Sequence, residues 1–226
     1  MRELIKKIPI IRTIARLAYQ KYLALRQPFT GSEDYWKQRY EAGGNSGAGS
    51  YSKFADFKAR ILNDFVDTHQ VTTVIEYGCG DGNQLKLANY PSYIGFDVSP
   101  QAISQCERLF SGDATKAFKL MEPVSNDTAE LTLSLDVIYH LIEDDVFASY
   151  IERLLDTSKK FVIIYASNTD EQVKFQSAHV KNRKFSNWID KHRPEWKLTK
   201  HIPNEYPYAG NENTGTFADF YIYQKT

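Results

Sequence analysis

The segment 71–97 constrains this chain more than any other part of it. A β-branched run, 71–75, ends at the acid Glu76, and three glycines follow at positions 78, 80 and 82. A short β-branched run beside glycines is typical of a buried parallel strand. Glycines let the chain turn with positive φ and let a ligand approach the backbone closely. The sequence therefore predicts an open α/β sheet with a ligand at the carboxyl ends of its strands.

A second acid belongs to the same pattern. The apolar run 93–96 ends at Asp97, and its strand is expected beside the first, so that both acids reach one sheet edge. An acid there can accept two hydrogen bonds from a ribose diol, and the helix after the glycines presents unpaired N–H groups. A dinucleotide site is the alternative, but it has the spacing G-x-G-x-x-G. Here the spacing is G-x-G-x-G, with Asn83 where close helix packing would begin.

The form E-x-G-x-G-x-G followed by this acid resembles the cofactor half of class I S-adenosylmethionine (SAM) methyltransferases. LSLDVIYHLIEDD (133–145) and FVIIYASN (161–168) resemble that family's fourth-strand motif and fifth strand. The resemblance runs from about Tyr35 to the C-terminus. It implies an α/β, Rossmann-like fold: a mostly parallel seven-stranded sheet, an antiparallel strand from a C-terminal hairpin, and helices on both faces. The motif order is also similar to bacterial enzymes of polysaccharide and lipopolysaccharide biosynthesis.

The resemblance implies SAM as cofactor and S-adenosylhomocysteine as product. It places the loop residues under the methionine and ribose parts, Asp97 on the ribose hydroxyls and Val98 on the adenine. Asp113 would hold the adenine amino group, and Asp136 would lie near the sulfonium and the amine. Arg39 would either pair with the SAM carboxylate or brace its own helix. The loop residues are Glu76, Tyr77, Gly78, Cys79, Gly80, Gly82, Asn83 and Gln84.

Methyl transfer requires an acceptor aligned with the methyl group, and a hydroxyl acceptor requires a general base. His140 is the first candidate, because it follows the fourth strand and an imidazole titrates near neutral pH. A hydrogen-bonded structural histidine is the alternative. His179 is the second candidate; the basic residues beside it, Lys181, Arg183 and Lys184, either meet an anionic acceptor or form a solvated face.

We expect O-methylation of a sugar or glycan hydroxyl. The alternatives are methylation of another small molecule and a SAM-binding scaffold without turnover. The amino-methylating signatures N-P-P-Y and D-P-P-Y are absent and the net charge is zero, which argues against a nucleic-acid partner. No resident metal is expected. A Mg²⁺ site made by Asp136, His140 and Asp144 would require one continuous helix through all three residues.

Three segments are expected along the chain. Residues 1–27 form a basic amphipathic helical extension, in which 1–26 carry seven basic residues and one acid. It lies on an anionic membrane surface, or it packs on the domain or on a second subunit. Residues 28–70 form a helical cap with the glycine-rich loop 43–50 as a lid, helped by Trp36, Tyr40 and Tyr51. Residues 71–226 form the SAM-binding domain. With two cysteines outside any metal-type spacing, a reducing, cytoplasmic location is expected, with the inner face of the membrane as an option.

Spacing and breakers predict the individual elements. Ser32 is expected to cap the first helix of the cap segment, and the third strand is barely recognisable. Helices are expected at 33–42, 52–69, 101–109, 144–156 and 182–192, a helical turn at 136–141, and strands from 71, at 93–96, 129–135, 160–166, 196–202 and 216–224.

Overall fold

The computed structural model describes residues 29–122, 126–172, 176–211 and 213–226. Its α-helices are α3 (Ser32–Glu41), α4 (Ser52–Thr68), α5 (Pro100–Leu109), α6 (Asp144–Asp156) and α7 (Phe185–His192). Its strands are β1 (Val74–Tyr77), β2 (Tyr93–Asp97), β3 (Lys116–Leu120), β4 (Ala129–Leu135), β5 (Ser158–Ala166), β6 (Trp196–Ile202) and β7 (Asp219–Lys225). Short 3₁₀ helices are η1 (Ala48–Ser50), η2 (Gln84–Leu87) and η3 (Ile138–His140).

The strands form one seven-stranded sheet in the order β3-β2-β1-β4-β5-β7-β6. The first five are parallel, and β7 runs antiparallel between β5 and β6. The strand order reverses between β1 and β4, and in such sheets ligands bind above this point. The predicted fold, with its antiparallel C-terminal hairpin, is confirmed.

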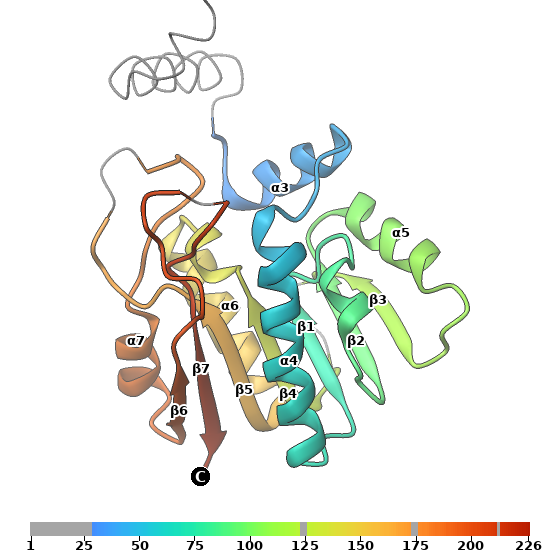
Figure 1. The fold of residues 1–226 in the computed structure, drawn as a ribbon. Helices are drawn as coiled ribbons and strands as arrows, with labels where there is room; N and C mark the ends of the chain where they lie inside the picture. The colour runs from blue at the N-terminus through green and yellow to red at the C-terminus, as the bar shows by residue number, and fades with distance from the viewer. Residues whose placement is uncertain (1–28, 123–125, 173–175, 212) are drawn as a thin grey trace, which may run out of the picture.

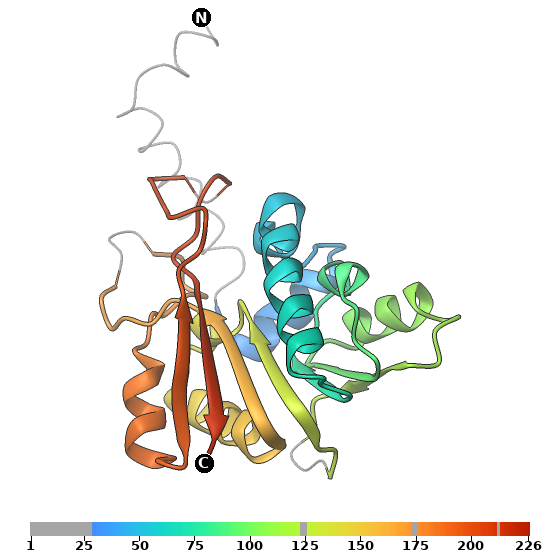
Figure 2. The same ribbon diagram turned by 60° about the horizontal axis from the view of Figure 1, so that its bottom comes forward.

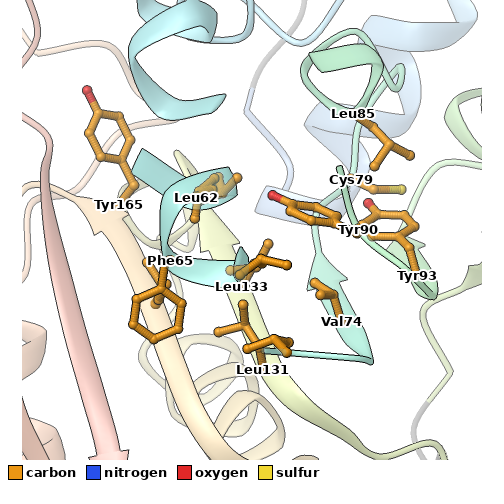
Figure 3. Close-up of a cluster of buried hydrophobic side chains, with 14 of the residues drawn as sticks. Leu62, Phe65, Val74, Cys79, Leu85, Tyr90, Tyr93, Leu131, Leu133 and Tyr165 are labelled. Carbon is orange, nitrogen blue, oxygen red and sulfur yellow. The ribbon is translucent and has the colours of Figure 1, made fainter. Parts of the chain in front are cut away.

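Helices cover both faces of the sheet (Figures 1 and 2). The alternation of side chains along β5 shows why both faces need cover: Phe161, Ile163 and Tyr165 pack under α4, whereas Val162 and Ile164 pack under α6 and α7. Figure 3 shows the α4 side, where helix residues meet β1, β4 and β5. Because the helices bury both faces, polar side chains reach solvent mainly at the strand ends.

Several element boundaries differ from the predicted ones. β1 begins at Val74 instead of 71, because the N–H of Val71 still bonds to the carbonyl of Val66 at the end of α4. The helix expected after the glycines is only the 3₁₀ turn η2. The third strand is β3, an edge strand without the continuous buried pattern that would have revealed it. Helix α7 starts at Phe185, since the Asn182 side chain bonds to Ser167 and to the carbonyl of Glu171.

Ser32 does not cap α3 as predicted. Gly31 occupies the N-cap position, and Ser32 is the first helical residue. The Ser32 hydroxyl donates to Glu143 Oε2 (2.6 Å) and accepts from the N–H of Ile142 (2.8 Å). This serine therefore fixes α3 to the loop before α6, above the carboxyl ends of the strands.

The extension 1–27 lies outside the described residues, so its membrane or protein contact stays a prediction. Within the part of the chain that the structure describes, no helix is both long enough and apolar enough to cross a membrane.

Candidate active site

A cavity of about 320 Å³ opens at the carboxyl ends of β1, β2 and β4. Its size lies in the range of pockets for small ligands. Its lining combines the glycine turn, the cap helix α3, helix α4 and helix α6. Its lining residues include Glu33, Trp36, Tyr40, Ser46, Lys58, Glu76, Gly78, Cys79, Gly80, Gln84, Asp97, Val98, Met121, Asp136, Val137, His140, Asp145 and Arg153.

The glycine turn is closely packed from both sides. Gly78 has φ 85°, and a Cβ added there would lie 2.5 Å from Val137 Cγ2. Gly80 has φ 60°, and its Cβ would lie 2.3 Å from Ser46 Oγ. Only glycine satisfies both the backbone angle and the space. The turn therefore leaves bare backbone facing the cavity, where a polar ligand can approach it.

Two buried acids stand at the ends of β1 and β2. Asp97 accepts from the N–H groups of Gly80 (3.0 Å) and Ser99 (2.9 Å), and burial raises its pKa to about 6. Glu76 accepts from Tyr93 Oη (2.7 Å), and burial raises its pKa to about 7. A carboxylate accepts about four hydrogen bonds, so Asp97 retains acceptor capacity for a diol. The predicted meeting of these acids at one edge is found.

Asp136 follows β4 and is held by two partners that the sequence did not indicate. Its Oδ2 accepts from Lys58 Nζ (2.6 Å), and its Oδ1 accepts from Tyr139 Oη (2.8 Å). Lys58 comes from the middle of α4 and its side chain is 1% exposed. The Asp136 backbone has φ 60°, which costs a non-glycine residue about 1 kcal/mol. Such strain is common at functional sites.

The two predicted catalytic histidines lie together, 5.4 Å apart between ring centroids. His140 lines the cavity, and its Nδ1 lies 2.9 Å from the backbone carbonyl of His179. Burial lowers the pKa of His140 to about 4, so the ring is neutral at pH 7. His179 stacks on Tyr35 at 4.2 Å and does not line the cavity. Trp36 meets the His140 ring edge-on at 4.9 Å.

The glycine-rich loop 43–50 is fixed onto the glycine turn by Asp81. Asp81 Oδ2 accepts from the N–H of Ser46 (3.0 Å) and from Tyr51 Oη (2.7 Å), while its own N–H donates to Ser46 Oγ (3.0 Å). Burial acts to raise the Asp81 pKa, but these hydrogen bonds outweigh it and leave the pKa below its usual value. A Cβ on Gly49 would lie 2.7 Å from Asp136 Oδ2. The loop thus covers both the turn and Asp136.

Several residues assigned to the cofactor site do not line the cavity. Asp113 precedes β3, at the opposite end of the strand from the site, and pairs with Lys116. The Tyr77 side chain points to the other sheet face, where it stacks on Phe96. The backbone of Gly82 packs against helix α5. At the carboxyl end of β3 the cavity is lined by Met121, whose N–H bonds to the carbonyl of Asp97.

Asn83 and Arg39 also serve other contacts. Asn83 Nδ2 donates to the carbonyl of Ser50 (2.7 Å) and so supports the loop 43–50. Arg39 Nε donates to the carbonyl of Asn45 (2.7 Å), and the guanidinium lies over Trp36. Of the two readings of Arg39, the structure shows the brace. By contrast, Gly78, Cys79, Gly80, Gln84 and Val98 line the cavity together with Glu76 and Asp97.

Among the described residues, the continuous helix that a Mg²⁺ site at Asp136, His140 and Asp144 would require is not present. The short helix η3 ends at His140, and α6 starts only at Asp144, so no single helix carries Asp136, His140 and Asp144. Asp144 pairs with Lys181 and Arg183, and Asp136 pairs with Lys58. Across the described residues, no group of three His, Cys, Asp or Glu side chains is placed to hold a metal ion.

The comparisons with known proteins agree with this geometry. Residues 75–163, from β1 to β5, match the family model described as a methyltransferase domain, and no curated protein matches the sequence. Similar solved structures include the N-methyltransferase NodS from Bradyrhizobium japonicum WM9 with S-adenosylhomocysteine (TM-score 0.57, 13% identity, 74% of this chain, 84% of that chain). Magnesium protoporphyrin IX methyltransferase from Synechocystis PCC 6803 with S-adenosylhomocysteine has a TM-score of 0.60 at 10% identity, over 90% of this chain and 99% of that chain.

A third similar structure is the small RNA methyltransferase HEN1 (TM-score 0.54, 16% identity, 78% of this chain, 26% of that chain). At such identities these structures share the fold with this chain, and the matched domain adds the activity. The fold is that of class I methyltransferases, and the matched domain, residues 75–163, includes the glycine turn and both buried acids of the cavity. The chain is a SAM-dependent methyltransferase, and SAM is its cofactor. The bare glycine turn and the two buried acids fit that cofactor.

Proposed function

We propose that this enzyme transfers the methyl group of SAM to a hydroxyl of a sugar or glycan, in the tailoring of a cell-surface polysaccharide, with His140 as the general base. Methylation of another small molecule and SAM binding without turnover are the alternatives. The observation that carries the proposal is the placement of His140: its imidazole lines the cavity, and its Nδ1 faces the backbone carbonyl of His179.

That contact fixes the tautomer. A carbonyl oxygen can only accept a hydrogen bond, so Nδ1 carries the ring proton and Nε2 keeps its lone pair. SAM supplies an electrophilic methyl group, and a hydroxyl attacks it effectively only as its proton leaves. His140 Nε2 is the atom that takes this proton. It then passes the proton to solvent, which restores the neutral imidazole.

The surroundings of His140 favour a ring-shaped acceptor. Trp36 lines the cavity and meets the His140 ring edge-on, whereas Tyr35 and His179 stack on each other beside these two rings without lining the cavity. Flat aromatic faces pack well against the C–H face of a sugar ring, while polar groups orient its hydroxyls. Glu33 and Asp145, which also line the cavity, offer acceptors for such hydroxyls.

The loop 43–50 would act as a lid over this chemistry. Its hydrogen bonds to Asp81 and its contact with Asp136 support the closed position. Closing excludes water, and SAM entry would require these bonds to open.

The test is methyl transfer to defined acceptors. We expect S-adenosylhomocysteine to form with free, nucleotide-linked or lipid-linked sugars, and the sugar product to gain one methyl group by mass spectrometry. An RNA oligonucleotide and a small aromatic amine serve as comparison acceptors. Turnover with either of these and none with the sugars would reject the glycan assignment. SAM binding without turnover on any acceptor would favour the scaffold.

A further inference from the structure

We propose that Lys58, and not Arg39, is the cation that binds the methionine carboxylate of SAM. The proposal rests on SAM as the cofactor and does not depend on the acceptor. The sequence offers Arg39 for this role, with bracing of its own helix as the alternative, and no motif indicates Lys58.

The first observation is the incomplete hydrogen bonding of a buried ammonium. Lys58 is fully buried and lines the cavity. An ammonium has three N–H donors, and one of them bonds to Asp136 Oδ2. The Tyr165 ring, 5.3 Å away, offers only its face. In the described part of the chain no second acceptor lies within hydrogen-bond distance of Lys58. Since unfilled donors on a buried charge are costly, this arrangement calls for an acceptor from a ligand.

The second observation is the distribution of charge around the cavity. The carboxyl groups of Glu76, Asp97 and Asp136 stand at the ends of β1, β2 and β4. The basic side chains on the lining are Lys58 and Arg153, and Arg153 comes from α6 on the opposite sheet face. The methionine part of SAM is a zwitterion. The acids can serve its ammonium group, and Lys58 is the cation beside them for its carboxylate.

The third observation is that Arg39 is engaged elsewhere. Its Nε donates to the carbonyl of Asn45 (2.7 Å), and its Nη1 lies 3.4 Å from Tyr35 Oη. Its guanidinium lies over the Trp36 ring, 5.5 Å from the centroid. Arg39 therefore holds α3 and the loop 43–50 together and does not line the cavity.

A role limited to neutralising Asp136 is the alternative for Lys58. The two roles differ in one respect: only a carboxylate-binding lysine distinguishes a ligand with the carboxylate from one without it. The probes are S-adenosylhomocysteine and its decarboxylated analogue, which keeps the amine. Binding is measured by calorimetry, without any acceptor, on the wild type and the variants Lys58→Met and Arg39→Met.

We expect Lys58→Met to weaken S-adenosylhomocysteine binding at least about tenfold, the loss of one charge-assisted hydrogen bond, and to leave the analogue's affinity nearly unchanged. Arg39→Met should not change the ratio of the two affinities. Equal losses for both ligands in Lys58→Met, or a changed ratio only in Arg39→Met, would overturn the proposal.

Lys58→Met leaves the Asp136 carboxylate without its cation, and the variant is at risk of unfolding. The double variant Lys58→Met/Asp136→Asn leaves no unpaired charge, and it is compared with Asp136→Asn, in which the Lys58 ammonium keeps an amide oxygen as a hydrogen-bond acceptor. If the double variant retains the ligand ratio of Asp136→Asn alone, Lys58 does not bind the carboxylate. Failure of the glycan proposal would show in turnover assays and leave these binding data untouched.

Discussion

His140 Nδ1 lies 2.9 Å from the backbone carbonyl of His179, a contact between residues 39 positions apart. It joins the loop after β4 to the segment after β5. Because the backbone of His179 makes the contact, the side chains of the two histidines can be tested separately.

His140→Gln is expected to lower kcat by about 10²–10⁴, the usual contribution of a general base, with S-adenosylhomocysteine affinity nearly unchanged. His179→Ala retains the carbonyl that orients His140, so its kcat should fall by less than about tenfold. Steady-state kinetics with a sugar acceptor and calorimetry make the comparison. Equal losses of kcat in both variants would contradict the assignment of the base to His140.

We expect kcat to show no fall near pH 6.5, the pH at which an ordinary histidine becomes protonated. Burial lowers the pKa of His140 to about 4, so the neutral, proton-accepting form persists as pH falls from 8 to 5.5 and is lost only near pH 4. The measurement is kcat at saturating substrates, with circular dichroism at each pH to verify folding. A steady fall of kcat below pH 6.5 would show a base with an ordinary pKa.

Glu76→Gln should change how the stability of the ligand-free protein depends on pH. Burial raises the pKa of Glu76 from 4.5 to about 7. The folded state therefore holds this proton more tightly than the unfolded chain, and the associated stability is complete below pH 4.5 and lost as pH rises through 7. The shift corresponds to about 3 kcal/mol. Urea unfolding should show the wild type losing this amount relative to the glutamine variant between pH 4.5 and 8; parallel curves would contradict it.

Gly49→Ala should displace the loop 43–50 from Asp136, because its Cβ would lie 2.7 Å from Asp136 Oδ2. We expect weaker SAM binding by about tenfold or more, as for the loss of one good contact. Gly112→Ala is the control, since a Cβ there meets nothing within 4 Å and its φ is not positive. Calorimetry on both variants decides; unchanged binding in Gly49→Ala would mean that the loop yields freely.

Tyr51→Phe removes the hydroxyl that donates to Asp81 Oδ2 at 2.7 Å. A hydrogen bond to a charged group contributes about 1.5–3 kcal/mol, so the loop should open more often. Limited proteolysis near Asn45 should then be faster than in the wild type, and S-adenosylhomocysteine should slow it in both proteins. No protection by the ligand would reject the lid.

The cofactor half of the site could be predicted because its signals are local. The glycines, Glu76 and Asp97 lie within 22 residues, and a parallel sheet brings strand ends to one edge. The structure differs from the prediction for Tyr77 and Asp113, because residue spacing does not determine which way a side chain points or at which end of a strand a residue lies. Tyr77 sits beside Glu76 in the chain, but alternation along a strand turns it to the opposite face. Asp113 was assigned to the site, but β3 starts only after it.

The residue pattern alone predicts the fold class, the cofactor and the sheet edge at which we propose that it binds, because β-branched runs, glycines and acids at close spacing have few structural solutions. Only the tertiary structure brought Lys58 to Asp136, across 78 positions of the chain, and His140 to His179. Helix packing on a sheet depends on the apolar face of the helix, and a lysine within α4 carries no local sign of which strand end it will meet. Such contacts depend on how α4 packs on β4 and β5, and no short sequence pattern encodes that packing.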